Sequence, residues 1–208
     1  MREFALQIRG NPETFTFILQ QTRKNYFYMI YISMNNVSFT GTYIRPATVY
    51  KNSEPVRTAV IELGHNDIKS VQSLANKWDS WLTNLMCAKF YEPEKHKNAR
   101  FFAISTQENN FQKVNPSKIL AMFEVDDNKT KYTMEYLDVH PKYRKNPNIV
   151  NEKRKGITKI GDACIKFIRE RFATKKETDL YAVDSAKPFY EKVGCKKVEG
   201  KSDNRYLI

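Results

Sequence analysis

Apolar and polar side chains alternate along much of residues 3–45, which is the period-two pattern of β-strands. A turn-forming cluster at 10–13 and the pair Asn35 and Asn36 separate the alternating runs. A helix over 11–21 is the competing prediction, because a proline at its second position suits a first helical turn. The strands predicted are 4–8, 15–19, 26–33 and 37–44, with the last two joined as a hairpin.

The alternation ends after residue 45. Residues 46–56 carry two prolines and turn-forming side chains, which predicts a boundary there. A strand is predicted at 58–63, followed by a long helix with Asn66 or Asp67 as its N-cap. The helix is predicted from apolar residues at steps of three and four, namely Ile68, Val71, Leu74, Ala75, Trp78, Trp81, Leu82, Leu85 and Met86.

Residues 132–172 read as a strand, a basic turn and a helix. Mixed apolar and polar positions over 132–139 predict a strand covered on both faces, and Pro141 ends it because proline cannot donate to a sheet ladder. A basic loop follows over 142–155, and Gly156 is predicted to open the helix. The helix is predicted to bury one apolar stripe, namely Ile157, Ile160, Ala163, Cys164, Phe167, Ile168 and Phe172. Free N–H groups and the positive dipole end at such a helix start suit a phosphate-bearing ligand, and a solvated basic helix start is the alternative.

The same periodicities predict the remaining elements. Strands are expected at 101–105, 118–125, 179–183, 195–198 and 205–208, with a short helix at 186–192. The order is therefore strand, helix, a run of strands, helix, strand, helix and a closing strand or pair of strands. This order predicts an α/β fold of the α+β kind, with helices flanking a central sheet.

The charge balance is strongly basic. Lysine and arginine number 35 against 23 aspartate and glutamate, which gives a formal charge of +12 and a pI of about 9.5. Such a surplus favours polyanionic partners, including nucleotides, RNA or DNA. A lysine-rich surface that serves solubility alone is the alternative.

Cysteine usage and hydropathy bear on the compartment. Cys87, Cys164 and Cys195 cannot form a fully paired disulfide framework, which favours a reducing environment. The N-terminus has no secretory signal pattern, and the longest apolar run, 26–32, is too short to span a bilayer. We therefore expect a cytoplasmic protein with no membrane partner. The histidines lack the spacing of metal ligands, so no metal is expected.

Two motifs in the right order carry a family resemblance. Val139-His140-Pro141 ends the strand before the basic loop, and residues 186–195 read AKPFYEKVGC. Together they resemble the GNAT superfamily of acetyl-CoA-dependent N-acetyltransferases over about residues 57–208. The family has Val-x-Pro at a strand end, Arg/Gln-x-x-Gly-x-Gly/Ala at a helix start, and later Tyr-Glu-Lys-x-Gly-Phe. The resemblance implies a GNAT-like mixed, mostly antiparallel sheet at 57–208, after an N-terminal β-rich module at 1–50.

The basic loop departs from the family pattern. Lys153 stands where Arg or Gln is usual, and Thr158 stands where Gly or Ala is usual. Residues near 145–152 look inserted before the loop, and Arg144 is the alternative occupant of the family's arginine position. These changes affect the side chains that would hold a pyrophosphate, but they leave the backbone amides in place.

The resemblance implies acetyl-CoA as the acyl donor. Tyr190 matches the family's tyrosine and is the predicted general acid, because a phenol with a pKa of about 10 keeps its proton at neutral pH. A packed aromatic side chain is the alternative. The residues implied in CoA binding are Leu137, Asp138, Val139, Lys153, Arg154, Lys155, Gly156, Ile157, Thr158, Lys159 and Lys192.

Glu135 is the predicted general base, acting through water. Strand alternation places it on the face of Val139, and a carboxylate on a covered strand is costly unless it is used or paired. A structural salt bridge with a lysine is the alternative. The predicted reaction is direct acetyl transfer to a primary amine on a protein, an aminoacyl-tRNA or another nucleotide-linked acceptor. The alternative is a nucleic-acid-binding or partner-binding protein with a non-catalytic acetyltransferase-like fold.

Overall fold

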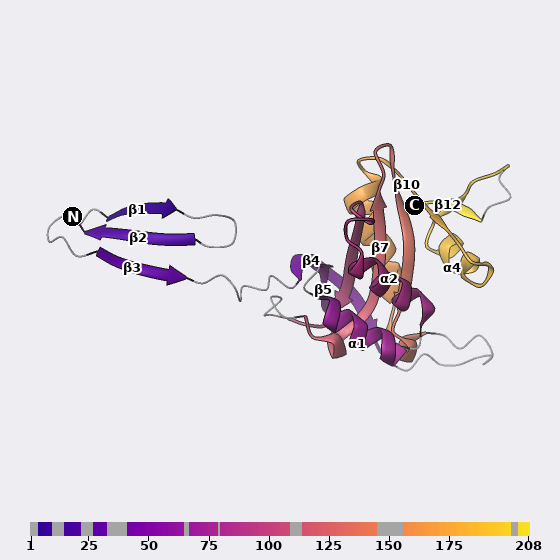
Figure 1. Ribbon diagram of the computed structural model, residues 1–208. Helices are drawn as coiled ribbons and strands as arrows, with labels where there is room; N and C mark the ends of the chain where they lie inside the picture. The colour runs from indigo at the N-terminus through magenta and orange to yellow at the C-terminus, as the bar shows by residue number, and fades with distance from the viewer. Residues whose placement is uncertain are drawn as a thin grey trace. The chain divides into compact units, whose positions relative to one another are not determined.

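The structure is a computed structural model that describes residues 4–9, 15–21, 27–32, 41–64, 67–78, 80–108, 114–144, 156–200 and 204–208 (Figure 1). Contacts divide the chain into two compact units, Met1–Ser38 and Phe39–Ile208, and each is described by itself.

Within the described residues of the smaller unit, three strands form an antiparallel sheet. They are β1 (Phe4–Arg9), β2 (Phe15–Gln21) and β3 (Phe27–Ile32), in the order β1-β2-β3. The strand prediction for 15–19 is therefore confirmed, and the competing helix over 11–21 is wrong. The turn at Asn35 and Asn36 lies outside the described residues.

Within the described part of the larger unit, nine strands form one sheet in the order β11-β12-β10-β8-β7-β6-β5-β4-β9. Neighbours are antiparallel except β8 and β10, which are parallel, so the predicted mixed, mostly antiparallel sheet is confirmed. The strands are β4 (Thr42–Lys51), β5 (Glu54–Leu63), β6 (Ala99–Ser105), β7 (Ile119–Asp127), β8 (Lys131–Val139), β9 (Ile157–Thr158), β10 (Glu177–Tyr181), β11 (Lys196–Lys197) and β12 (Arg205–Leu207).

A β4–β5 hairpin occupies the boundary predicted at 46–56. Asn52 and Ser53 close it with φ values of 50° and 71°, the left-handed geometry of tight hairpin turns. Pro46 fits within β4 because β9 pairs only with its last residues, so no partner strand needs the missing N–H. Thr42 pairs with Glu62 of β5. The hairpin predicted between 26–33 and 37–44 stays a prediction, because residues 33–40 lie outside the described residues.

Two helices replace the single long helix predicted after residue 67. They are α1 (Ile68–Trp78) and α2 (Trp81–Tyr91), separated by Ser80 in an extended conformation. The Ser80 hydroxyl donates to the Asp138 carboxylate on β8, and the Thr83 hydroxyl does so at 2.7 Å. These buried hydrogen bonds hold the start of α2 on the sheet, at the position where the predicted single helix is interrupted.

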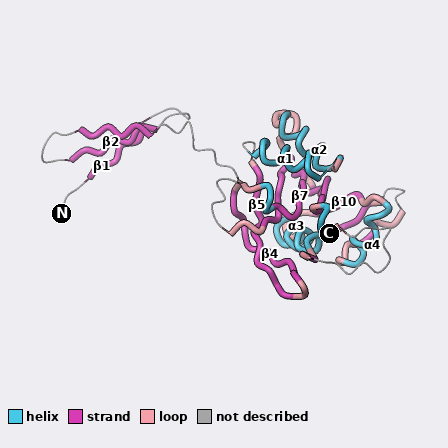
Figure 2. Tube along the Cα trace, turned by 90° about the horizontal axis from the view of Figure 1, so that it is seen from below, coloured by secondary structure: helices cyan, strands magenta, loops and turns pink. Residues whose placement is uncertain are grey.

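Helices cover both faces of the sheet. Figure 2 shows α1 and α2 on one side and α3 (Ile160–Ile168) on the other. A π-helical turn, Arg169–Ala173, extends α3, and α4 (Lys187–Lys192) follows β10. The 3₁₀ turns are Pro116–Lys118, Pro141–Tyr143 and Asp184–Ala186. No helix in the described part of the chain is long and apolar enough to cross a membrane.

The larger of the two cores lies between the sheet and α3. The Phe102 ring stacks on Phe123 with centroids 5.3 Å apart, and Phe167 and Phe172 meet Phe102 at 5.4 and 5.7 Å. Phe167 and Phe172 belong to the apolar stripe predicted for this helix, so the burial of that stripe is confirmed. Aromatic contacts of this kind add to the free energy of burial and fix α3 on the sheet.

Candidate functional site

The parallel strands β8 and β10 run together and then part. They pair from Lys131–Glu177 to Met134–Leu180, and within the described residues β8 has no pairing with β10 beyond Met134. We call the segment of β8 from Glu135 to Val139 the splay. An unpaired strand edge presents backbone donors and acceptors, so a ligand can pair with β8 at the splay and extend the sheet.

Leu137 and Val139 direct their backbone groups into the opening beside the splay. The His140 N–H donates to the Leu120 carbonyl of β7 at 2.8 Å. Because backbone groups alternate along a strand, those of Leu137 and Val139 point the other way, toward β10. The Val139 carbonyl accepts from Arg144 Nε at 2.6 Å, which leaves Leu137 as the open position.

A β-bulge distorts β8 at the same point. Glu124 pairs with Tyr136 and Val125 pairs with Met134, so Glu135 is the extra residue. Met134 and Val139 both pack on the α3 side although they are five residues apart, so the alternation is broken between them, and Tyr136 packs on the α1–α2 side. The prediction that Glu135 and Val139 share a face is therefore wrong, because the bulge shifts the alternation and turns Glu135 toward Lys89 of α2.

Asp138 and Arg144 fasten the end of β8. The Asp138 side chain is buried and accepts from Ser80, Thr83 and the Arg144 guanidinium. Its carboxylate therefore serves the junction of sheet and α2, and its backbone groups face β7 as those of His140 do. Arg144 holds both Asp138 and the Val139 carbonyl, and its side chain keeps 42% exposure at the start of the basic loop.

Part of the predicted pyrophosphate loop belongs to the sheet. Ile157 and Thr158 form β9 and pair with Lys51 and Tyr50 of β4. Gly156, just before them, has a φ of 102°, which an L side chain rarely adopts. The prediction that Gly156 opens the helix is therefore wrong. Lys153, Arg154 and Lys155 lie outside the described residues.

The helix begins at Ile160, after Lys159 in the left-handed conformation with φ of 58°. The first ladder bond runs from the Ala163 N–H to the Lys159 carbonyl at 3.1 Å, so the preceding amides have no intrahelical acceptor. Gly161 lies in this first turn, and a Cβ there would stand 2.8 Å from Cζ of Phe189 in α4. The glycine-bearing helix start of this chain is therefore 159–162, and sequence spacing alone did not find it.

Tyr190 lies in the core on the α3 side. Its ring is 5.1 Å from Phe189 and 6.3 Å from Tyr206, measured between centroids. Burial raises the pKa of the phenol, and the neighbouring Cys195 and Cys164 raise it further. Tyr190 therefore keeps its proton throughout the neutral range. Lys192 is exposed at the end of the same helix.

Glu135 and Tyr190 stand on opposite faces of the sheet. Glu135 is exposed, forms no ion pair within the described residues, and has a pKa raised by partial burial and by the charge of Asp126. The structure thus keeps the two predicted catalytic groups apart in the resting chain. Groups on opposite faces can meet only across an opening in the sheet. The sheet has such an opening beside the splay, where β8 and β10 part.

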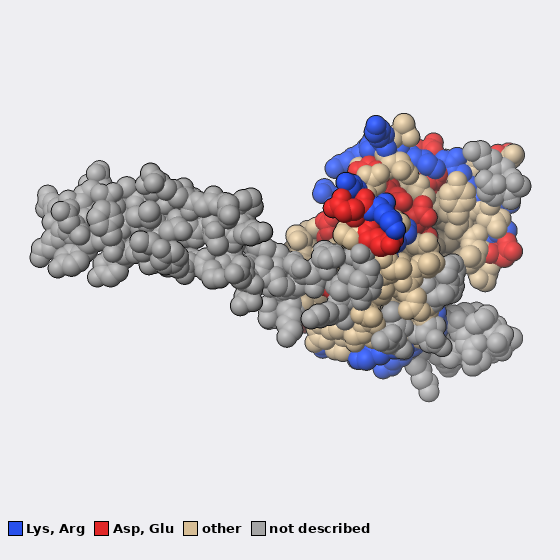
Figure 3. All heavy atoms as spheres, in the orientation of Figure 1, with Lys and Arg blue, Asp and Glu red and all other residues tan. Residues whose placement is uncertain are grey.

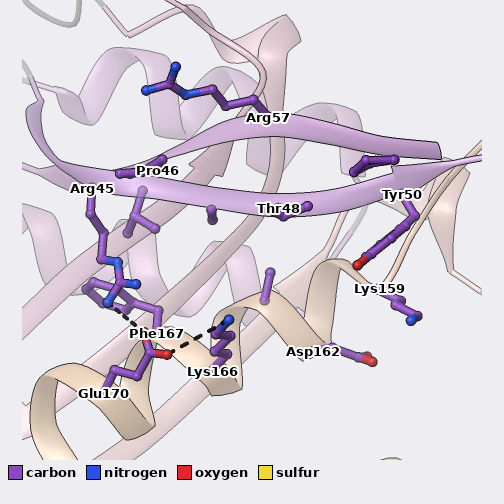
Figure 4. Close-up of a pocket in the computed structure, with 14 residues that line it drawn as sticks. Arg45, Pro46, Thr48, Tyr50, Arg57, Lys159, Asp162, Lys166, Phe167 and Glu170 are labelled. Atoms are coloured by element: carbon purple, nitrogen blue, oxygen red, sulfur yellow. Dashed lines mark ion pairs between the residues drawn. The ribbon is translucent and has the colours of Figure 1, made fainter.

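A cavity of about 740 Å³ lies elsewhere, between the β4–β5 hairpin and α3 (Figure 4). Small side chains, Ala47 and Ala163, leave the space between strand and helix. Figure 4 shows Arg45 pointing to Glu170, at 2.6 Å, and Tyr50 pointing toward Lys159. In the sheet order, β6 and β7 separate this cavity from β8, so it is distinct from the splay.

The contact between Glu124 and Lys89 was not predicted from the sequence. Glu124 is fully buried on β7, and one of its oxygens bonds the Lys89 ammonium of α2. A lone carboxylate inside the apolar run 119–125 was the available signal, because an ionised group in a covered strand needs a partner. Lys89 is not part of the apolar stripe predicted for the helix, which ends at Met86, so no pattern connected the two residues.

Comparisons with known proteins give a fold-level likeness. No family model matches the chain, and no curated protein matches it. A solved structure that is similar is the crystal structure of the PaiA N-acetyltransferase from Thermoplasma acidophilum in complex with coenzyme A. The two chains are 14% identical with a TM-score of 0.46, and the match covers 72% of this chain and 96% of that one.

Proposed function

We propose that the larger unit is an N-acetyltransferase that moves the acetyl group of acetyl-CoA directly to a primary amine. The splay carries this proposal, because the sheet opens there between the buried Tyr190 on one face and the exposed Glu135 on the other. A thioester lying in such an opening is reached by the amine from one side and by a proton donor from the other. The motif at 139–141 follows directly on the splay, and the motif at 190–194 begins with the buried Tyr190.

CoA would be held by backbone more than by side chains. The open edge at Leu137 suits the amides of a pantetheine arm, which would add to the sheet as an extra strand does. The free amides at the start of α3 suit the pyrophosphate. Lys153, Arg154, Lys155, Lys159 and Lys192 remain proposed charge partners of the phosphates.

The transfer needs no covalent intermediate on the protein. The amine nitrogen attacks the thioester carbonyl carbon, and the C–S bond breaks as the amide forms. The leaving thiolate takes a proton from Tyr190, whose raised pKa ensures that the phenol carries one. Glu135, through water, is the proposed acceptor of the proton that the nitrogen loses.

Titration calorimetry with CoA tests the proposal. We expect the wild-type protein to bind one CoA, and Lys159→Glu to bind it at least tenfold more weakly, since a charge-assisted contact contributes about 1.5–3 kcal/mol. Lys129→Glu makes the same charge change in the exposed β7–β8 turn and should bind like wild type. A folded wild-type protein that does not bind CoA would refute the acetyltransferase assignment.

A further inference from the structure

The strand β4 has an open edge beside the cavity at α3. On one side β4 pairs with β5 from Thr42 to Lys51, whereas on the other side β9 pairs only with Tyr50 and Lys51. Within the described residues, no strand pairs with residues 46–49 on the β9 side. An edge of this kind can accept a further extended chain.

Two hydrogen bonds fix the direction of the backbone groups along this edge. The Ala47 carbonyl accepts from the Thr58 hydroxyl of β5 at 3.0 Å, so Ala47 faces inward. The Tyr50 carbonyl accepts from the Thr158 hydroxyl of β9 at 3.3 Å, so Tyr50 faces outward. Because backbone groups alternate along a strand, those of Thr48 also face outward, past the end of β9.

The open edge offers one donor and two acceptors to an added chain. Thr48 has both an N–H and a C=O, whereas Pro46, the next residue to face outward, has only its C=O. Both residues are exposed. The proline prevents continuous pairing along β4, so the edge suits a short segment and not a whole strand.

One face of α3 and of the turn after it forms the opposite wall of the cavity. Its residues follow steps of three and four, namely Lys159, Asp162, Ala163, Lys166, Phe167 and Glu170. At about 1.5 Å per helical residue this wall is about 16 Å long, which matches about five residues of an extended chain at about 3.3 Å each. We call this space, between a strand edge and a helix, the β4–α3 groove.

The middle of the β4–α3 groove is apolar. Val60, Phe167 and Ala163 are 0%, 2% and 7% exposed, and the half-buried Ala47 packs against the same core. Two of these four side chains are single methyl groups, which leaves room for a side chain from outside. An occupant that places one apolar side chain here gains the free energy of its burial.

One end of the β4–α3 groove has a surplus of positive charge. Arg45 lies 2.6 Å from one carboxylate oxygen of Glu170, and Lys166 lies 4.0 Å from the other (Figure 4). Two cations therefore share one carboxylate, and the Lys166 side chain is 73% exposed. The other charged residues of the lining stand away from this end, namely Arg57, Lys159 and Asp162. The surplus favours a second carboxylate, supplied by the occupant.

We propose that the β4–α3 groove is a docking site for an extended peptide segment of a partner protein, with an apolar and an acidic residue two positions apart. The peptide backbone pairs with Thr48 and with the Pro46 carbonyl. Residues two apart in an extended chain point to the same side, so the apolar side chain packs on Phe167 and the acidic one meets Arg45 and Lys166. The site does not depend on the proposed acetyl transfer, because β5, β6 and β7 separate β4 from the splay.

NMR titration of the ¹⁵N-labelled full chain with acetyl-Thr-Val-Thr-Glu-Thr-amide tests the site. We expect the Thr48 amide resonance to shift saturably, and Lys166→Glu to bind the peptide about fivefold more weakly, the upper range for an exposed ion pair. Lys175→Glu makes the same charge change at an exposed position after α3 and should bind like wild type. No saturable shift in wild type, or equal affinity in Lys166→Glu and wild type, would overturn the inference.

Thr48→Pro tests the strand pairing separately from the charge. It removes a backbone N–H that faces away from β5, so the β4–β5 ladder keeps its hydrogen bonds. We expect the peptide to bind about tenfold more weakly, because the edge loses its donor. Wild-type affinity in Thr48→Pro would refute pairing with β4. If this variant does not fold, the comparison of Lys166→Glu with Lys175→Glu still decides.

Two further titrations distinguish the peptide from other occupants of the groove. Dilution of wild type without peptide should leave the Thr48 amide resonance unmoved. A shift with protein concentration would indicate that two copies pair through β4, which contradicts the proposal. The peptide should also bind equally with and without saturating CoA, and its displacement by CoA would place it at the cofactor site instead.

Discussion

At the scale of single residues, the candidate site depends on ionisable groups displaced from their usual pKa. Burial acts on Tyr190 and Glu124 in the same direction, because both are acids whose charged form is disfavoured away from water. The two raised pKa values have different consequences for proton transfer. Tyr190 remains a proton donor at every neutral pH, whereas Glu124 exchanges its proton in that range.

The hydroxyl of Tyr190 gives the sharpest test at this scale. Tyr190→Phe keeps the packed ring and removes the proposed proton donor, so turnover should fall by about 10²-fold while the affinity for acetyl-CoA stays close to wild type. Steady-state kinetics with n-butylamine as acceptor and calorimetry with CoA measure the two quantities.

Tyr206→Phe is the matched control for that variant. Tyr206 is fully buried beside Tyr190 and donates its hydroxyl to Glu191 at 2.9 Å, away from the proposed chemistry. It should lose stability but keep turnover in the folded fraction. A Tyr190→Phe protein with wild-type turnover would remove Tyr190 from the mechanism.

At the scale of elements, the base of the splay is clamped by one buried carboxylate. Asp179 of β10 accepts from Lys131 at 2.7 Å, from Thr133 at 2.8 Å and from Arg205 at 2.6 Å. These bonds join β8, β10 and β12 just below the point where β8 and β10 part. Burial raises the pKa of Asp179, but the three donors outweigh it and the pKa is lowered overall. The stability from this clamp is therefore present above the unfolded pKa and is lost as pH falls through the lower folded value.

The contact between α3 and α4 is a second element-scale feature that can be tested. Gly161→Ala places a Cβ 2.8 Å from the Phe189 ring, so the helices must shift or the ring must move. We expect a loss of about 1–3 kcal/mol in the free energy of unfolding, measured by urea denaturation, as for other overpacked contacts.

Phe189→Leu supplies the rescue for this contact. Combined with Gly161→Ala, the smaller side chain should restore part of the lost stability, because it withdraws the atoms that the new Cβ meets. If the double variant is as unstable as the sum of the two single variants, the contact between these residues is not the cause.

At the scale of the whole molecule, the formal net charge is +12, and several of the cations are held in ion pairs within the fold. Lys89, Lys131, Arg100 and Arg205 of the larger unit are paired with carboxylates. On the face that Figure 3 draws, acidic and basic side chains of the described residues lie interspersed. A mixed surface of this kind favours weak, non-specific attraction to polyanions.

Salt dependence separates that attraction from specific recognition of nucleic acid. We expect tRNA and duplex DNA to bind similarly in filter assays at about 50 mM salt and to be released by about 200 mM, because phosphate contacts exchange with counterions. A tRNA complex that survives the higher salt and exceeds duplex DNA in affinity would instead favour a nucleotide-linked acceptor or the nucleic-acid-binding alternative.

The sequence by itself determined most of the elements. Periodicity placed β5 to β8, β10 to β12 and the apolar stripe of α3, because each follows from neighbouring residues and one buried face. It did not place β9, which lies in the predicted helix, or the second half of β4, which lies in the predicted boundary. The assignment of Tyr190 and Glu135 to a shared site stays a prediction. It came from the spacing of two motifs, which describes the chain and not the space around it.

Only the tertiary structure decided where the chemistry lies. Alternation along β8 assumed an unbroken ladder, and the extra residue at Glu135 depends on pairing with Glu124 across the sheet. The helix begins at Ile160 and not at the predicted Gly156, because Ile157 and Thr158 pair with β4 as a strand. Pairing partners distant in sequence set both outcomes, and residue patterns within one segment carry no information about such partners.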